Sequence, residues 1–294
     1  MKLSRKLFAV ILALAVGTLA AGCGSSSQTK ELKLGNIGWD ENVAISNLTK
    51  VLLEDELGYD NVELRTLDVG PLYDGVGNGD LHAFQDVWLP AHSEYVAGVE
   101  DNAELLGPWF LGTTKLGIAV PSYMNIASLE ELNDTTADLI LGIEPGAVSM
   151  TKIPEEVMPA YGLKHKLVEA PTEGMLYEVE RLYNDREEFA FIAWSPHWMN
   201  QRYDFRYLKD PKDAFEEVDD TLDLSTIVNE DLKEDEPEAY AFMAALALDE
   251  EQINAMEDEI NTASDPQTGV TNWLENNRSV VEPWLEAARN ARKS

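Results

Sequence analysis

Short apolar segments alternate with amphipathic helical segments along this chain, and this alternation limits the fold more than any other feature. Residues 32–37 have the composition of a buried strand, and Asp40 can cap the helix that follows and ends at Gly58. Residues 62–67 and 83–88 are predicted to form two further strands. Strands that alternate with helices predict an α/β fold with a largely parallel sheet.

A second set of strands and helices follows the first. An apolar strand at 116–120 ends at Pro121, and we expect it to carry the chain into another domain. Strands are then predicted at 139–143 and 189–194, with helical segments between them. The acidic, irregular stretch 210–224 is a plausible second crossing between the domains.

The pattern therefore predicts two α/β lobes that exchange the chain twice. From residue 237 onward the sequence is helical to its end, which adds a helical layer to the first lobe. The predicted division is residues 31–117 with 225–294 for lobe 1, and residues 118–224 for lobe 2.

The first residues have the layout of a secretory signal peptide. A basic start precedes an apolar run at 7–16 and small residues up to Cys23. Such a run is too short for a membrane span, which needs about 20 residues. Residues 19–23 resemble a bacterial lipobox, which implies removal of 1–22, a lipid on Cys23, and a tether at 23–30. The alternative is an incidental cysteine near an ordinary cleavage site.

The charge of the chain excludes several classes of function. With 22 basic and 54 acidic residues the net charge is −32, and the acids are spread along the whole sequence. Such a field repels nucleic acid and anionic membranes. We interpret it as a solvated surface suited to high external salt, in which charge repulsion is screened.

Motifs of enzymes and metal proteins are missing from the sequence. The glycines at 75–79 lack the spacing of a dinucleotide fingerprint, and a glycine-capped helix end explains them better. There is no nucleophile elbow, Walker loop or zinc-protease motif, and 4 histidines with 1 cysteine give no metal-ligand spacing. We expect neither catalysis nor a cofactor.

Three tryptophans lie where predicted strands end. Trp39, Trp88 and Trp194 each follow or close such a segment, and ligands of open α/β sheets bind at the carboxyl ends of strands. A single tryptophan is more often part of a core, but three at matching positions indicate a ligand site.

The remaining tryptophans and their neighbours are given structural roles. Trp198 is assigned to packing within its lobe and His197 to the surface. Asp40 is interpreted as a helix cap, not as a partner for a cation. Core positions are assigned to Trp109, Trp273 and Trp284.

Six sequence blocks, in order, resemble the glycine betaine binding proteins of ABC transporters, the OpuAC and ProX type. They are Gly-Trp-Asp at 38–40, Asp-Val-Gly-Pro-Leu at 68–72, Trp-Leu-Pro-Ala-His at 88–92, Lys-Leu-Gly at 115–117 running on to Met124, Gly-Ile-Glu-Pro-Gly-Ala at 142–147, and Trp-Ser-Pro-His-Trp at 194–198. The resemblance implies the two-lobe, type II periplasmic-binding-protein architecture, with a ligand cleft that closes between the lobes.

The resemblance also implies an aromatic cage made of Trp39, Trp88 and Trp194. A trimethylammonium group carries a full charge but no hydrogen to donate, so aromatic faces hold it well. Each face contributes about 0.5 to 2 kcal/mol. Micromolar affinity requires about 8 kcal/mol, so other contacts must add to the cage.

The carboxylate end of the ligand requires hydrogen-bond donors. By the same resemblance these are the backbone N–H groups of Gly142 and Ile143, together with His92. The loop at 144–146 leads into a predicted helix, and anions are favoured near helix N-termini.

The function implied is an exported lipoprotein that captures glycine betaine, or a related compatible solute, for osmoprotection. Its partners would be the permease and ATPase subunits of an ABC transporter, with the membrane reached through the lipid anchor. A choline-binding relative and a ligand sensor of the same fold are the alternatives. An exported hydrolase is a distant third, because no motif supplies a nucleophile or base.

Overall fold

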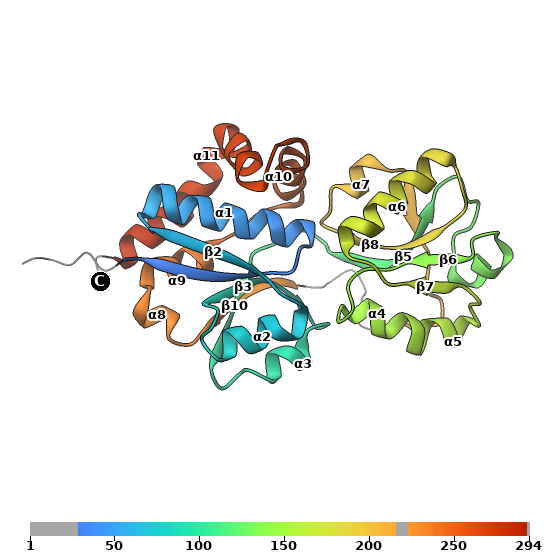
Figure 1. The fold of residues 1–294 in the computed structure, drawn as a ribbon, viewed down its shortest axis with the longest axis horizontal. Coiled ribbons are helices and arrows are strands. Elements are labelled where there is room, and N and C mark those ends of the chain that lie inside the picture. The colour runs from blue at the N-terminus through green and yellow to red at the C-terminus, as the bar shows by residue number, and fades with distance from the viewer. Residues whose placement is uncertain (1–28, 216–222, 293–294) are drawn as a thin grey trace, which may run out of the picture.

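The computed structural model describes residues 29–215 and 223–292, and the chain forms two lobes, each with its own sheet (Figure 1). The predicted signal peptide, Cys23 and most of the predicted tether lie outside the described residues. The two-lobe α/β fold class is confirmed. Among the residues described, no helix is both long and apolar enough to cross a membrane.

The first sheet has the strand order β2-β1-β3-β10-β4. Its members are β1 (Glu31–Asn36), β2 (Asn61–Thr66), β3 (Ala83–Leu89), β4 (Ala103–Pro108) and β10 (Asp223–Asn229). β1 pairs in parallel with β2 and β3, whereas β10 returns from the other lobe and pairs antiparallel with β3 and β4.

Helices cover both faces of this sheet, with α1, α10 and α11 on one side and α2 and α3 on the other (Figure 1). The helices of this lobe are α1 (Asp40–Leu57), α2 (Val69–Gly77), α3 (Ser93–Ala97), α8 (Leu232–Asp235), α9 (Pro237–Ala245), α10 (Glu250–Thr262) and α11 (Pro266–Ala291). α1 ends where Gly58 takes a left-handed conformation, φ 74°, which glycine adopts without strain.

The second sheet has the order β7-β6-β8-β5-β9. Its strands are β5 (Lys115–Pro121), β6 (Leu139–Leu141), β7 (Lys166–Val168), β8 (Ala190–Ser195) and β9 (Phe205–Tyr207). Its helices are the 3₁₀ turn Leu129–Asp134, α4 (Val148–Lys152), the π turn Ile153–Val157, α5 (Met158–Tyr161), α6 (Thr172–Asp185) and α7 (Met199–Arg202).

The chain leaves the first sheet after β4 and has joined the second sheet by the first residue of β5. It returns between β9 and β10. The predicted lobe boundaries, at 117/118 and at 224/225, therefore fall inside β5 and β10. Hydrophobic patterning locates a strand, but the sheet that the strand joins depends on its neighbours in space.

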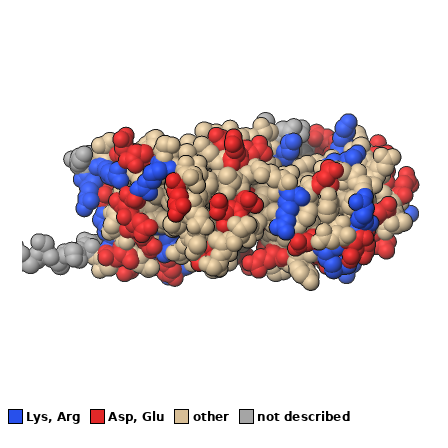
Figure 2. Space-filling model, turned by 90° about the horizontal axis from the view of Figure 1, so that it is seen from above, with Lys and Arg blue, Asp and Glu red and all other residues tan. Residues whose placement is uncertain are grey.

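Buried aromatic side chains fill the interior of the first lobe. Trp109, Trp273 and Trp284 are all buried, which confirms their assignment to the core. The acidic side chains are distributed along the whole length of the molecule on the face drawn in Figure 2 and do not gather in one patch.

Candidate ligand-binding site

A cavity lies between the two lobes and is lined from both. The lining residues are Trp39, Glu41, Trp88, Ala91, His92, Leu116, Ile143, Ala147, Val148, Ser149 and Trp194. The structure thus brings together five of the six predicted ligand residues, although they come from segments more than a hundred residues apart. Gly142, the sixth, does not line the cavity.

Trp88 and Trp194 occupy corresponding positions in the two sheets. Each lies near the end of its strand, β3 or β8, opposite a leucine of the antiparallel strand next to it. Trp88 pairs with Leu224 of β10 and Trp194 with Leu116 of β5. β3 and β8 are the central strands of their sheets, and both tryptophans reach the cavity from the strand end. Trp39 completes the set from the turn before α1.

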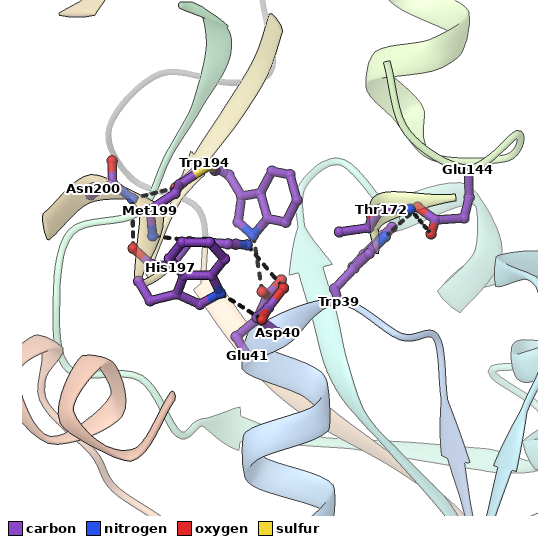
Figure 3. Close-up of polar contacts among 10 residues, drawn as sticks. Trp39, Asp40, Glu41, Glu144, Thr172, Trp194, His197, Met199 and Asn200 are labelled. Atoms are coloured by element: carbon purple, nitrogen blue, oxygen red, sulfur yellow. Dashed lines mark hydrogen bonds and ion pairs between the residues drawn. The ribbon is translucent and has the colours of Figure 1, made fainter. Parts of the chain in front are cut away.

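The indole of Trp39 is anchored to the opposite lobe. Its Nε1 donates to Glu144 Oε2 at 3.1 Å (Figure 3). Glu144 is itself fixed by Thr172, whose backbone N–H donates to Oε1 at 2.7 Å and whose hydroxyl donates to Oε2 at 2.8 Å. The ring edge of Trp39 is therefore held in place, which leaves its face for a ligand.

Carboxylates anchor the other two indoles in the same way. Trp194 Nε1 donates to Glu41 Oε2 at 2.9 Å, across the cleft, and Trp88 Nε1 donates to Asp86 Oδ1 at 3.0 Å, within its own lobe. Burial, and then the charges of Asp86 and Glu257, raise the pKa of Glu41 well above its usual range. Burial also raises the pKa of Asp86 well above its usual range.

A second cross-lobe contact lies beside the cavity and corrects two predictions. Asp40 does not cap α1: it is the first helical residue, and its carboxylate accepts a hydrogen bond from Trp198 Nε1 at 2.7 Å. His197 is not on the surface but fully buried, with Nε2 3.0 Å from Asp40 Oδ2 (Figure 3). His197 Nδ1 accepts from the Met199 N–H, so the ring hydrogen lies on Nε2, the nitrogen nearer to Asp40.

His92 is buried and has a defined tautomer. Its Nδ1 accepts from the backbone N–H of Trp88 at 3.2 Å and lies 2.8 Å from the Tyr73 hydroxyl. A backbone N–H can only donate, so Nδ1 carries no hydrogen and Nε2 does. Burial lowers the pKa of His92 to about 3, which keeps the ring neutral near pH 7. His92 therefore offers the cavity a neutral N–H donor.

The two predicted backbone donors differ from each other. The Gly142 N–H is already bonded to Val168 O at 2.8 Å, so it is not free in this arrangement. The Ile143 N–H meets only Met150 Sδ at 3.4 Å, and a thioether is a weak acceptor that a carboxylate can replace. Ser149, which no sequence motif indicated, also lines the cavity, and its hydroxyl can donate a hydrogen bond.

Sequence reasoning missed the carboxylates that hold the cage. Glu41 lies two residues after Trp39, and Asp86 two before Trp88, so proximity to a cage tryptophan was the available signal. It was weak because 54 acids are spread along the chain. Glu144 lies within a block already noticed, yet its partner Trp39 is 105 residues away.

Comparison with known proteins identifies what this arrangement is similar to. The family described as the substrate binding domain of ABC-type glycine betaine transport systems matches residues 30–276. The glycine betaine/carnitine transport binding protein GbuC of Listeria monocytogenes is 28% identical over 160 residues, which cover 53% of this chain and 51% of that relative. The chain thus matches about half the length of this curated relative.

Two solved structures have the same fold. Lactococcal OpuAC, in a closed conformation complexed with glycine betaine, is 30% identical with a TM-score of 0.78, covering 87% of this chain and 99% of that one. ProX of Borrelia burgdorferi is 24% identical with a TM-score of 0.79, covering 89% and 100%, and at that identity it supports the fold alone.

Proposed function

The chain belongs to the family of substrate-binding domains of ABC-type glycine betaine transport systems, and from this premise we propose that it captures glycine betaine outside the cytoplasm. It is a binding protein of a transporter and not an enzyme. The observation that carries the proposal is the convergence of Trp39, Trp88 and Trp194 on one cavity between the lobes. A closely related quaternary ammonium solute would satisfy the same cage.

The tryptophans suit a cation that cannot donate hydrogen bonds. Their indole N–H groups are all bonded to carboxylates, so what remains for a ligand is the electron-rich face of each ring. Such faces attract a quaternary ammonium group by about 0.5 to 2 kcal/mol each. Because two of the anchoring bonds cross the cleft, the cage is complete only when the lobes are closed.

The opposite side of the cavity suits a carboxylate. We propose that His92 Nε2–H, the Ile143 N–H and the Ser149 hydroxyl donate to it. Gly142 would then shape the loop instead of contacting the ligand, because a Cβ there would lie 2.6 Å from Met150 Sδ. Choline has no carboxylate, so these donors favour a betaine over choline.

The anchor and the partners also remain proposals. Cys23 lies outside the described residues, and we propose on the sequence alone that removal of 1–22 exposes it for lipidation. Metabolic labelling with a radioactive fatty acid, lost in Cys23→Ser, tests the anchor.

We further propose that the closed protein delivers its ligand to the permease and ATPase of an ABC transporter.

Calorimetric titration of the purified protein with glycine betaine, and separately with choline, tests the ligand. We expect betaine to bind more tightly, and Trp39→Ala to weaken betaine binding roughly 5- to 30-fold. Tyr177→Ala is the matched control, because Tyr177 is an aromatic residue 71% exposed on α6. The proposal would be contradicted if neither solute bound. It would also be contradicted if Trp39→Ala and Tyr177→Ala lost the same betaine affinity.

A further inference from the structure

Three buried carboxylates stand directly behind the aromatic cage. Glu41, Asp86 and Glu257 are between 0% and 2% exposed. They come from α1, β3 and α10, three elements of the first lobe. In each of the three, at least one carboxyl oxygen has no hydrogen-bond partner among the described residues. In Glu257 neither oxygen has such a partner.

Two of these carboxylates contact the tryptophans of the cage directly. Glu41 lines the ligand cavity and accepts the Trp194 indole, while Asp86 accepts the Trp88 indole. A positive charge held between those two rings therefore lies close to two of the three carboxylates. Glu257 lies behind them, near enough for its charge to act on Glu41.

No described basic side chain neutralises the group. Neither Lys nor Arg forms an ion pair with any of the three carboxylates in residues 29–215 and 223–292. The other titratable groups that face them are Asp40 on α1, Tyr73 on α2, His92 beside the cage, and His197 of the second lobe, which contacts Asp40.

Ionisation of all three buried carboxylates is unfavourable without a basic partner among the described residues, because each charge loses its hydration and repels the others. Burial is the main reason why the pKa values of all three are raised, and their mutual repulsion adds to it for Glu41 and Glu257. The net charge of −32 acts in the same direction. All these causes favour a proton on the group as long as no cation lies beside it.

We propose that capture of the ligand is coupled to release of a proton from the Glu41–Asp86–Glu257 group. The cation that enters the cage supplies the positive charge that the protein itself withholds, and Glu41 becomes ionised beside it. The carboxyl proton passes to solvent, and the carboxylate remains as the counter-charge of the quaternary ammonium. This inference rests on the proposed function, since it requires a cationic ligand in the cage.

Calorimetry in buffers of different ionisation enthalpy counts the protons released. We expect the heat of glycine betaine binding near neutral pH to change linearly with the buffer's ionisation enthalpy, with a slope of up to about one proton per ligand. For one proton, the Kd rises about tenfold for each unit by which the pH is lowered. A slope of zero with tight binding would overturn the inference and leave the proposed function standing.

A neutral isostere separates the charge of the ligand from the closure of the cleft. In 3,3-dimethylbutyrate a carbon atom replaces the nitrogen of glycine betaine, so the shape and the carboxylate are kept and the positive charge is lost. We expect weaker binding with no proton release. Equal proton release with the isostere would overturn the inference, because closure alone would then expel the proton. If betaine itself does not bind, the proposed function falls, and this inference falls with it.

Substitutions locate the proton. Glu41→Gln should abolish the dependence on buffer, and Glu251→Gln, an exposed glutamate at the start of α10, should keep it. Glu257→Gln leaves Glu41 in place but removes a repulsive neighbour, so the slope should fall without vanishing. An unchanged slope in both Glu41→Gln and Glu257→Gln would overturn the assignment.

Discussion

The tryptophans of the cleft and those inside the first lobe differ in what their indole N–H groups contact. In the cleft all four, including Trp198, donate to a carboxylate. In the lobe interior, Trp109 donates to the backbone oxygen of Gln85, and Trp273 Nε1 has no hydrogen-bond partner among the described residues. The interior rings fill space, whereas the cleft rings are oriented.

Orientation by carboxylates has a consequence for closure. Three of the four cleft indoles donate to a carboxylate of the opposite lobe, and they do so in both directions. Each lobe therefore contributes rings that the other lobe holds. Burial alone would not distinguish these rings from the interior ones, since all are at most 9% exposed. The difference predicts that substitutions in the two regions affect different measurable properties.

The largest effect is expected for a ring of the interior. Trp284, 3% exposed and packed edge-on against Phe242, should cost about 3 to 5 kcal/mol of unfolding free energy when changed to Ala, because a large cavity remains. Urea unfolding measures this loss. The betaine affinity of the folded fraction should stay within about twofold of the wild type. A large loss of affinity would show that the two regions are not separable.

Asp40→Ala should separate closure from the ligand contacts. It removes the acceptor of Trp198 Nε1 and the carboxylate that lies 3.0 Å from His197 Nε2, and a hydrogen bond to a charged group is worth about 1.5 to 3 kcal/mol. We expect the betaine Kd to rise roughly 30-fold or more. Small-angle scattering should show a more open molecule with betaine present.

The matched control for Asp40→Ala is Asp55→Ala, an exposed aspartate near the other end of the same helix. It should change neither the scattering nor the affinity. If Asp40→Ala closes on betaine like the wild type, the contact of Asp40 with Trp198 and His197 does not stabilise the closed conformation.

His92 should make the unfolding free energy of the protein decrease at low pH. Its pKa is lowered from 6.5 to about 3, so below about pH 6.5 the unfolded chain binds a proton that the folded chain does not. Stability is therefore lost as the pH falls, by about 2 kcal/mol at about pH 5. His92→Gln should lose that much less unfolding free energy between about pH 7.5 and about pH 5. Parallel curves for the two proteins would contradict the buried, neutral state of His92.

The smallest effect is expected for one face of the cage. Trp88→Ala should weaken glycine betaine binding roughly 5- to 30-fold, because one aromatic face is lost. Trp88→Phe keeps a face but loses the bond to Asp86, so we expect a loss of only a few-fold. Calorimetry with both variants measures the difference. Equal losses would mean that orientation by Asp86 matters as much as the ring itself.

Much of the architecture could be predicted from local patterns. The segments predicted as strands at 32–37, 62–67 and 83–88 correspond within a residue to β1, β2 and β3. Three tryptophans at strand ends were enough to select the cavity wall, because open α/β sheets bind ligands at the carboxyl ends of their strands. The ligand roles of these residues stay predictions until binding is measured.

Two predictions failed because the residues contact the opposite lobe. His197 looked like a surface residue and Asp40 like a helix cap, since each choice is reasonable for the local sequence alone. Their contact joins residues of two different lobes, and only the closed cleft buries it. Within the second lobe, the Gly142 N–H donates to the Val168 oxygen of β7, a partner that the local sequence does not indicate.

Local patterns predicted the two α/β lobes and the tryptophans that line the cavity, because strand and helix periods and strand ends are local properties. Six sequence blocks indicated the family. Which of the 54 acids are buried, and what they hold, depends on the tertiary contacts. The bonds from Trp39, Trp194 and Trp198 to their carboxylates span 105, 153 and 158 residues. The charge state of a carboxylate depends on what lies within a few ångströms of it, and for Glu41 that includes Trp194 of the other lobe.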